Sequence, residues 1–307
     1  MKWLITGGSG FTGMHLLLTI QQQFPEDEIL ICDIKSPIIK LNEKVKYKAV
    51  DLLDEKQVVK IVINSNPDRI MHLAGLMYDE NPLLMTKVNV ITCGILLEII
   101  HSCKLTIDGI LVVGSVAQYG KTDPKNPPSE KDCCIPSSFY GYLKLLQEKL
   151  ALKYIKDYNL PIICVRPANI IGPFMPSSFL IPSILEQLID SKRNLKSRTI
   201  RLKHTKAARD FIDVRDITKA YVSLLEHPKT RGEIFNIGCN RAISIEEIIE
   251  NIKQILSIDI LKIEEENPKK EFDFHLTNSL KIQSFIQWKP SISLKTTLED
   301  MIKNFTT

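Results

Sequence analysis

A tyrosine and a lysine stand four positions apart in the segment YGYLK, at Tyr140 and Lys144. The segment opens a helical pattern, and residues four apart in a helix project from the same face. A phenol normally titrates near pH ~10, and a neighbouring ammonium stabilises the phenolate. The pair therefore predicts a general acid or base, although the same spacing also suits an ordinary surface pair.

A glycine-rich segment, TGGSGFTG, follows the first apolar run of the chain. Its glycines at 8, 10 and 13 fit the pattern G-x-G-x-x-G between an expected strand and an expected helix. Small residues let backbone N–H groups approach a pyrophosphate, and the helix N-terminus adds partial positive charge. We predict a dinucleotide-binding turn, with a tight strand–helix connection as the alternative. The residues expected at the dinucleotide are Gly7, Gly10, Phe11, Thr12 and Gly13.

Asp33 closes the second expected strand, about twenty residues after this turn, where an acidic side chain accepts hydrogen bonds from an adenosine ribose. A 2′-phosphate would face the carboxylate, so Asp33 favours NAD over NADP. The competing possibility is that Lys35 and Lys40 turn inward and accept the phosphate, which keeps NADP open.

Short apolar runs alternate with amphipathic helical segments through the first half of the chain. The runs are rich in Ile, Leu and Val without polar alternation, as in a parallel sheet covered by helices on both faces. We predict an α/β fold: a Rossmann-type, doubly wound parallel sheet with a smaller α/β substrate-binding lobe. The expected strands are Lys2–Thr6, Glu28–Asp33, Tyr47–Val50, Arg69–Leu73, Gly109–Val113, Pro161–Val165 and Gly232–Ile237.

The two lobes are expected to interleave in sequence, because the pattern loosens after Arg166 and later returns to the main sheet. Residues 1–167 and about 210–237 are assigned to the dinucleotide-binding domain. Residues from about 168–209, with 238–307, are assigned to the nucleotide-sugar-binding lobe. Helices are expected at 216–226, 243–256 and 293–304.

The composition is that of a globular protein: 307 residues, 44% hydrophobic and 25% charged, with a formal net charge of +4. Basic residues gather in one stretch, which is too local for a nucleic-acid footprint but suits a diphosphate; a solvated basic loop and strand is the alternative. That stretch contains Lys192, Arg193, Lys196, Arg198, Arg201, Lys203, Lys206 and Arg209.

The N-terminus runs straight into the glycine turn without a signal-peptide pattern, and no apolar run is judged long enough to span a membrane. We therefore expect a cytoplasmic protein with neither a membrane nor a nucleic acid as partner. Its seven cysteines form no CxxC pair, which favours reduced core thiols. Its six histidines form no close pair, so no metal is predicted.

These motifs, with five further segments, resemble in order and spacing the extended short-chain dehydrogenases/reductases of the NAD-dependent epimerase/dehydratase type, which modify nucleotide sugars. The matches cover nearly the whole chain, and the pattern is most similar to the GDP-4-keto-6-deoxymannose reductases. The further segments are Asp51-Leu52, His72-Leu73-Ala74-Gly75, Asn89, GSVAQYG at 114–120 and RPANIIGP at 166–173.

The resemblance implies a catalytic set of Ser115, Tyr140 and Lys144. Ser115 would hydrogen-bond the sugar oxygen at the reacting carbon, and Tyr140 would exchange its proton. Lys144 would hold the nicotinamide ribose and lower the Tyr140 pKa.

The resemblance also implies binding residues. Asp51 and Leu52 would flank the adenine, and Asn169 would contact the substrate phosphates. Arg209 would grip the diphosphate, since a guanidinium fork suits phosphate geometry. Val116, like Ser115, would contact the substrate. Asn89 would mainly support the cofactor site from behind. The remaining residues expected at the cofactor are Leu73, Ala74, Gly75 and Pro167.

Departures from the family pattern narrow the activity. Dehydratases place an acidic residue just after the active-site Ser or Thr, where this chain has Val116 and Ala117. The epimerase-reductases that make GDP-fucose need a cysteine where Ala117 stands. The family has an arginine near Pro268 that is expected to contact the diphosphate, and this chain lacks it. The adjacent Lys269 and Lys270 supply charge without the bidentate fork of a guanidinium, so the sequence leaves open whether the nucleotide is GDP.

Four functions follow, in order of preference. The first is reduction at C4 of a nucleotide-linked 4-keto-6-deoxyhexose, and the second is 4-epimerisation with retained NAD. A 4-dehydrogenase is third, and a non-catalytic NAD-binding sensor is last because the whole catalytic set is present. The helical segments near 84–104 and 138–157 correspond to those that relatives pack into a four-helix bundle, so a homodimer is expected.

Overall fold

The computed structural model describes residues 1–193, 199–202, 207–259, 262–265 and 274–306. Within them, a parallel sheet of seven strands has the order β3-β2-β1-β4-β5-β6-β10. Its strands are β1 (Lys2–Thr6), β2 (Glu28–Asp33), β3 (Val45–Ala49), β4 (Arg69–His72), β5 (Gly109–Val113), β6 (Ile162–Pro167) and β10 (Ile234–Ile237).

The strand order reverses between β1 and β4, so a crevice is expected at the carboxyl ends of these strands. The predicted doubly wound parallel sheet is therefore confirmed, including the late strand β10, which pairs with β6. Three strands match the expected bounds, whereas β3 begins two residues earlier and β6 extends to Pro167.

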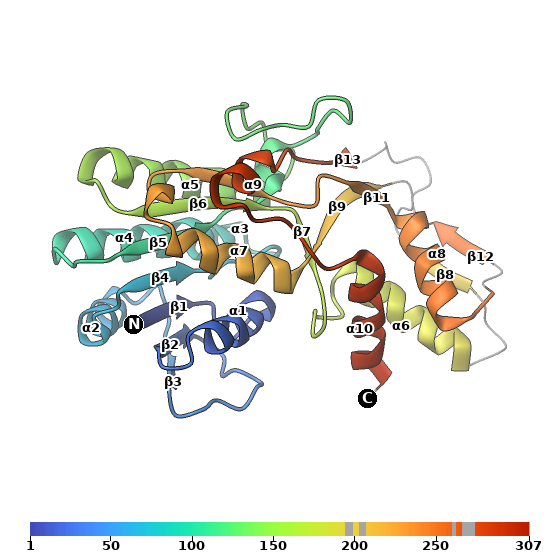
Figure 1. Cartoon of the computed structure of the whole chain (residues 1–307), viewed down its shortest axis with the longest axis horizontal. Coiled ribbons are helices and arrows are strands. Elements are labelled where there is room, and N and C mark those ends of the chain that lie inside the picture. Colours follow the sequence, from blue (N-terminus) through green and yellow to red (C-terminus); the bar gives the residue numbers. More distant parts are fainter. Residues whose placement is uncertain (194–198, 203–206, 260–261, 266–273, 307) are drawn as a thin grey trace.

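Helices cover both faces of this sheet (Figure 1). One face carries α1 (Phe11–Gln23) and α7 (Val214–Glu226), which pack against each other. The other carries α2 (Glu55–Ser65), α4 (Thr92–Ser102) and α5 (Phe139–Tyr158). Short helical segments complete this lobe: η2 (Val116–Tyr119) and η3 (Pro228–Thr230).

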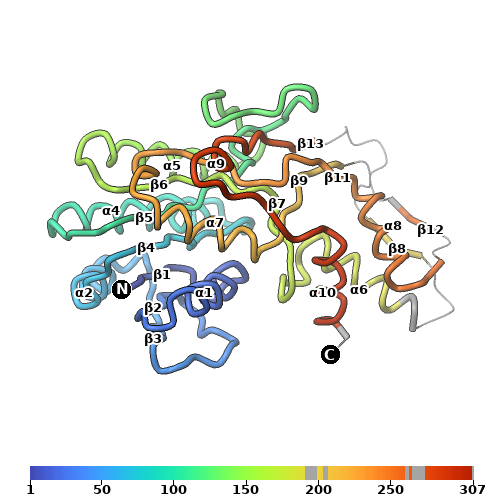
Figure 2. The backbone as a smooth tube through the Cα atoms, viewed as in Figure 1, coloured from blue at the N-terminus to red at the C-terminus, as the bar shows by residue number. Residues whose placement is uncertain are grey.

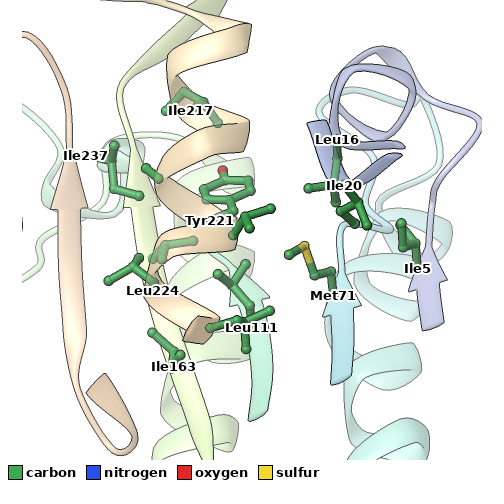
Figure 3. Packing of buried hydrophobic residues seen from close by; sticks show 14 of the residues in the cluster. Ile5, Leu16, Ile20, Met71, Leu111, Ile163, Ile217, Tyr221, Leu224 and Ile237 are labelled. Carbon is green, nitrogen blue, oxygen red and sulfur yellow. The ribbon is translucent and has the colours of Figure 1, made fainter. Parts of the chain in front are cut away.

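Successive strand residues supply two different cores, because side chains alternate between the faces of a strand. Ile5 belongs to one core, together with Leu16 of α1 and Tyr221 of α7 (Figure 3), whereas its neighbour Leu4 belongs to another, together with Leu97 of α4. Both faces are apolar, which explains why these strands lack polar alternation in the sequence.

The helical stretch before β5 is continuous: α3 (Pro82–Thr86), the π-helical turn η1 (Lys87–Ile91) and α4. By length and composition this stretch, Pro82–Ser102, is apolar enough to cross a membrane, so the expectation that the chain has no such run is wrong. In the fold, Leu97 and Ile100 on this stretch pack into the core of the large lobe.

A smaller lobe lies beside the large one (Figures 1 and 2). Strands β7 (Asn169–Ile171), β9 (Ala208–Asp213), β11 (Ala242–Ser244) and β13 (Phe274–His275) form a four-stranded sheet, and β8 (Thr199–Leu202) pairs with β12 (Lys262–Glu265). The helices α6 (Leu180–Arg193), α8 (Ile245–Leu256) and α10 (Leu294–Thr306) share a separate hydrophobic core.

One part of the expected division of the chain needs correction. Residues 238–307 were assigned to the small lobe, but α9 (Leu280–Ile286) packs against β10, and its Ile282 belongs to the core of the large lobe. The chain then crosses back, and Leu298 of α10 lies in the small-lobe core. The polypeptide therefore crosses between the lobes two more times than the sequence pattern suggests, once to reach α9 and once to return to α10.

Candidate functional site

A cleft of about 1360 Å³ runs along the carboxyl ends of the main-sheet strands and onto the small lobe. Except for Asn89, every residue predicted to bind cofactor or substrate lines it. These residues are Gly7, Gly10, Phe11, Thr12, Gly13, Asp33, Asp51, Leu52, Leu73, Ala74, Gly75, Ser115, Val116, Tyr140, Lys144, Pro167, Asn169 and Arg209. The fold thus brings the candidates together, and the role of each stays a prediction.

The glycine turn is built so closely that side chains would not fit. Gly7 has φ +70°, and a Cβ there would lie 2.7 Å from the backbone nitrogen of Ala74. A Cβ on Gly13 would lie 2.5 Å from the Cα of Gly8. Gly10 is the N-cap of α1 and has no side chain to cap it, so the first N–H groups of the helix remain for an anionic ligand.

Asp33 is held in place at the end of β2 by the backbone. One carboxylate oxygen accepts a hydrogen bond from Ser9 N at 3.0 Å, and the other accepts one from Lys35 N at 3.2 Å. The Tyr47 hydroxyl donates to the Asp33 carbonyl at 3.3 Å. The acid is therefore ordered beside the glycine turn, where an adenosine ribose would lie.

Ser115 and Tyr140 meet where two helical segments begin. Ser115 is the N-cap of η2, and its hydroxyl accepts a hydrogen bond from Ala117 N at 3.2 Å. Tyr140 lies in the first turn of α5, which Ser138 caps by accepting from Gly141 N at 3.1 Å. Both caps fix the entry of their segments, so the two side chains are positioned by local backbone structure.

The side chain of Lys144 is almost completely buried, at 4% exposed. Its Nζ donates to the Val113 carbonyl at 2.7 Å and to Gln147 Oε1 at 2.9 Å. Burial lowers the pKa of Lys144 to about 8. The Lys144 side chain is therefore positively charged below about pH 8.

The structure corrects the expected effect of this lysine on the tyrosine. Burial raises the pKa of Tyr140 to about 12, and a hydrogen bond with Ser115 only partly opposes the rise. Lys144 Nζ lies 6.0 Å from the centre of the Tyr140 ring and is hydrogen-bonded elsewhere. The pKa of Tyr140 thus lies above its ordinary value rather than below it, because desolvation of the phenolate dominates.

Asn89 is the predicted cofactor residue that does not reach the cleft. It lies in the π-helical turn η1, fully buried, and its Nδ2 donates to the carbonyls of Leu76 and Met85 at 2.8 and 2.9 Å. Its Oδ1 accepts from Leu76 N at 3.2 Å. Asn89 therefore braces the loop after Gly75, which fits the supporting role expected from the sequence.

The far end of the cleft is built by the small lobe. Arg209 lies on β9 and Asn169 on β7, which pair in parallel, and the Asn169 amide donates to the Asp210 carbonyl at 3.1 Å. Sequence reasoning missed other lining residues here because they come from loops and from the two-residue strand β13. They include Lys121, Ser137, Met175, Phe179 and His275.

Most of the predicted basic stretch lies outside the residues whose side chains are described, as do Lys269 and Lys270. Of the two described members, Arg209 lines the cleft, whereas the exposed Arg201 pairs with Glu264 of β12 at 3.2 Å. Of these two described residues, Arg209 is therefore the one whose position is compatible with binding a diphosphate in the cleft.

All seven cysteines are free thiols, and Cys32, Cys93 and Cys164 are buried, in line with the expected core thiols. Within the described residues, no group of three His, Cys, Asp or Glu side chains could hold a metal ion. The absence of a metal requirement remains a prediction.

A parallel sheet that ends in a glycine turn, an ordered acid beside it and a Ser-Tyr-Lys set in the same cleft define a dinucleotide-dependent oxidoreductase. Residues 3–238 match the model of the NAD dependent epimerase/dehydratase family. The chain belongs to this family and is an enzyme, as its sequence predicted.

Relatives with different activities are similar over nearly their whole length. The chain is 24% identical to GDP-6-deoxy-D-mannose reductase of Pseudomonas aeruginosa, covering 99% of this chain and 97% of that protein. It is 26% identical to UDP-glucose 4-epimerase of Halalkalibacterium halodurans, covering 97% and 94%. The solved structure of RMD from Pseudomonas aeruginosa complexed with NADPH superimposes with a TM-score of 0.86 at 24% identity, covering 99% and 98% of the two chains.

Proposed function

We propose that this enzyme transfers a hydride at C4 of a sugar linked to a nucleoside diphosphate, and that its substrate is a 4-keto-6-deoxyhexose that it reduces. One observation carries the proposal: the dinucleotide turn, the Ser115, Tyr140 and Lys144 set and Arg209 all line one cleft. Such a cleft accommodates a dinucleotide at one end and an anionic sugar nucleotide at the other.

The chain fits a nicotinamide dinucleotide by its own geometry. The space above Gly7 and Gly13 is too narrow for a Cβ, and the N-terminus of α1 offers N–H groups for a pyrophosphate. When bound there, the dinucleotide supplies the hydride. Asp33 would hold the adenosine ribose, and Lys144 would hold the nicotinamide ribose from its buried position.

The surroundings of Tyr140 suit the role of proton donor. The raised pKa keeps Tyr140 protonated at neutral pH, so its phenol can pass a proton to the oxygen of a sugar ketone as that oxygen gains negative charge. Ser115, hydrogen-bonded to Tyr140, would stabilise the same oxygen. The positive charge of Lys144 would then favour the phenolate that remains.

The direction of the reaction separates this proposal from its rivals. The full-length similarity to a GDP-6-deoxy-D-mannose reductase and the protonated phenol favour reduction. The similarly broad coverage of a UDP-glucose 4-epimerase supports epimerisation as the second candidate, because the same residues would serve both directions. Dehydratases have an acidic residue just after the active-site Ser or Thr, where this chain has Val116 and Ala117, and we therefore do not propose dehydration.

The test measures how many molecules of cofactor are oxidised for each molecule of sugar converted. Purified protein is mixed with NADH or NADPH and a nucleotide-linked 4-keto-6-deoxyhexose, and absorbance at 340 nm is followed together with the product by mass spectrometry. Reduction predicts one cofactor oxidised for each sugar that gains two hydrogens. Interconversion of a nucleotide hexose at C4 with tightly retained NAD and no net oxidation would support the epimerase instead.

We also propose a homodimer built on the stretch Pro82–Ser102 and α5. Large apolar side chains are exposed along both segments, and a second copy of the chain would remove them from water. They are Leu83, Ile91, Phe139, Tyr142 and Leu146. Light scattering at micromolar concentration should give twice the chain mass of 35.0 kDa, and a monomeric mass would contradict the proposal.

A further inference from the structure

The two ends of the cleft differ in charge. The acidic residues among its described lining residues are Asp33, the last residue of β2, and Asp51, which follows β3; they lie at the glycine-turn end together with Lys35. The end formed by the small lobe carries Arg209, His275 and Lys121. This end therefore favours an anionic ligand group, and its charge comes from three separate segments of the chain.

His275 stands directly beside Arg209. The two are Cα partners in the parallel pairing of β13 with β9, so their side chains lie on the same face, and both line the cleft. Thr122 fixes the backbone on both sides of His275: its hydroxyl donates to the Phe274 carbonyl and accepts from Leu276 N, each at 3.1 Å. The short strand is thus held against β9 at this point.

We infer that His275 is a second diphosphate-binding residue, which grips the substrate together with Arg209. The inference rests on the proposed function, since it assumes a nucleoside diphosphate sugar. A guanidinium binds a phosphate through two N–H groups, and an adjacent imidazole donates one further hydrogen bond and, when protonated, a second positive charge. No motif in the sequence marks His275, because its partner lies 66 positions away.

Substrate affinity should therefore depend on pH. Among the described residues, Arg209 and Lys121 line the same cleft as His275, and their charges disfavour the imidazolium, while a bound diphosphate favours it. Asp210 follows Arg209 on β9, but its carboxylate is buried and accepts from the backbone N–H groups of Cys239 and Asn240. A bound diphosphate stabilises the imidazolium over the neutral imidazole, so binding should be tighter at low pH than at high pH.

The experiment is calorimetry on the NAD-saturated protein at pH 6.0 and 8.5. The probes are UDP-glucose, dTDP-glucose and GDP-mannose, whose diphosphate diesters do not titrate in this range. At pH 6.0, His275→Gln should weaken binding of the accepted probe about tenfold, and at pH 8.5 by no more than about twofold. His275→Arg should keep tight binding at both values, which shows that charge is what the position supplies.

Controls separate the possible failures. His227→Gln, at an exposed histidine outside the cleft, should bind like the wild type at both pH values, and NAD affinity should be the same in all variants. Equal pH dependence of binding in the wild type and His275→Gln would overturn the inference while leaving the proposed function intact. If no probe bound the wild type, whereas NAD did, the proposed function itself would fail.

A sugar carboxylate is the other anion that His275 could meet. UDP-glucuronic acid and UDP-glucose therefore form a matched pair of probes. A diphosphate contact predicts that His275→Gln weakens both by the same factor, since they share the diphosphate. Loss confined to UDP-glucuronic acid would assign His275 to the sugar and contradict the diphosphate contact.

Discussion

The two ends of the cleft are built in different ways. At the glycine-turn end, backbone atoms make the surface: Gly7 and Gly13 leave no room for side chains, and the Asp33 carboxylate is anchored by two N–H groups. At the small-lobe end, side chains make it, and Arg209 and His275 come from strands far apart in the chain.

This difference teaches which half of the site can change. A backbone surface depends on φ and ψ angles and close packing, so most substitutions there disturb the fold itself. A surface of side chains on a separate lobe can exchange one contact without disturbing the main sheet. It follows that the small-lobe end can change its ligand more readily, and the names of two relatives carry different nucleotides, GDP and UDP.

The largest effect is expected at the junction of the two ends. Tyr140→Phe should lower turnover at least a hundredfold, about 2.7 kcal/mol in barrier height, and leave NAD affinity nearly unchanged, because the hydroxyl acts in proton transfer. Steady-state kinetics and NAD titration measure the two quantities. Tyr142→Phe, at an exposed tyrosine two positions along α5, is the matched control. Near-normal turnover in the Tyr140 variant would remove it from the catalytic set.

The next prediction tests the backbone-built end. Gly13→Ala forces a Cβ to within 2.5 Å of Gly8, so we expect a loss of about 2 kcal/mol in unfolding free energy and at least tenfold weaker NAD binding. Gly94→Ala is the control, since its Cβ meets only the Leu150 side chain at 3.2 Å and alanine favours a helix. Equal behaviour of the two variants would show that the turn is not sterically closed.

Much of the backbone-built end could be predicted from sequence, for a physical reason. The glycine turn, Asp33 and the Tyr140–Lys144 spacing are local patterns that specify their own geometry, and β1, β2 and β5 match their expected bounds. Strands that are covered by helices on both faces need apolar residues at every position, so the apolar runs in the sequence predicted a sheet covered on both sides.

The remainder depends on contacts that local patterns do not encode. His275 was missed because a two-residue strand has no periodicity, and its place beside Arg209 follows only from the tertiary fold. The Tyr140 pKa was expected to fall because its spacing to Lys144 was visible, whereas the burial that raises it was not. For Asn89 the resemblance implies a cofactor position that is mainly support, and its hydrogen bonds to Leu76 and Met85 place it behind the cleft.

A third prediction concerns the small-lobe end. Burial raises the pKa of Asp210 to about 7 in the folded protein, against an ordinary value of 3.8. The folded state thus holds the proton more tightly, and this stabilisation is present below pH ~4 and lost as pH rises toward ~7. Between pH 5 and 7, the unfolding free energy of the wild type should therefore fall relative to that of Asp210→Asn by about 2 kcal/mol.

Urea unfolding at pH 5.0, 6.0 and 7.0 measures this difference. Asp54→Asn is the control: Asp54 is an N-cap whose pKa is lowered by hydrogen bonds with Gln57, so it titrates below this window. If the wild type and Asp210→Asn showed parallel pH profiles, Asp210 would be ionised in the fold throughout, and its carboxylate would be an ordinary acceptor for Cys239 and Asn240.

The smallest effect should appear in cofactor choice. Asp33 is expected to make NAD preferred over NADP by about tenfold or more, through hydrogen bonds to the ribose and repulsion of a 2′-phosphate. The competing view has support, because Lys35 lines the cleft and a structural neighbour is complexed with NADPH. The carboxylate acts directly on the group that differs between the two cofactors, and Ser9 N and Lys35 N hold it in place, so we expect it to dominate. Calorimetry with both cofactors on the wild type and Asp33→Ala decides the matter: the variant should narrow the gap, and a wild-type preference for NADPH would assign the ribose end to Lys35 instead.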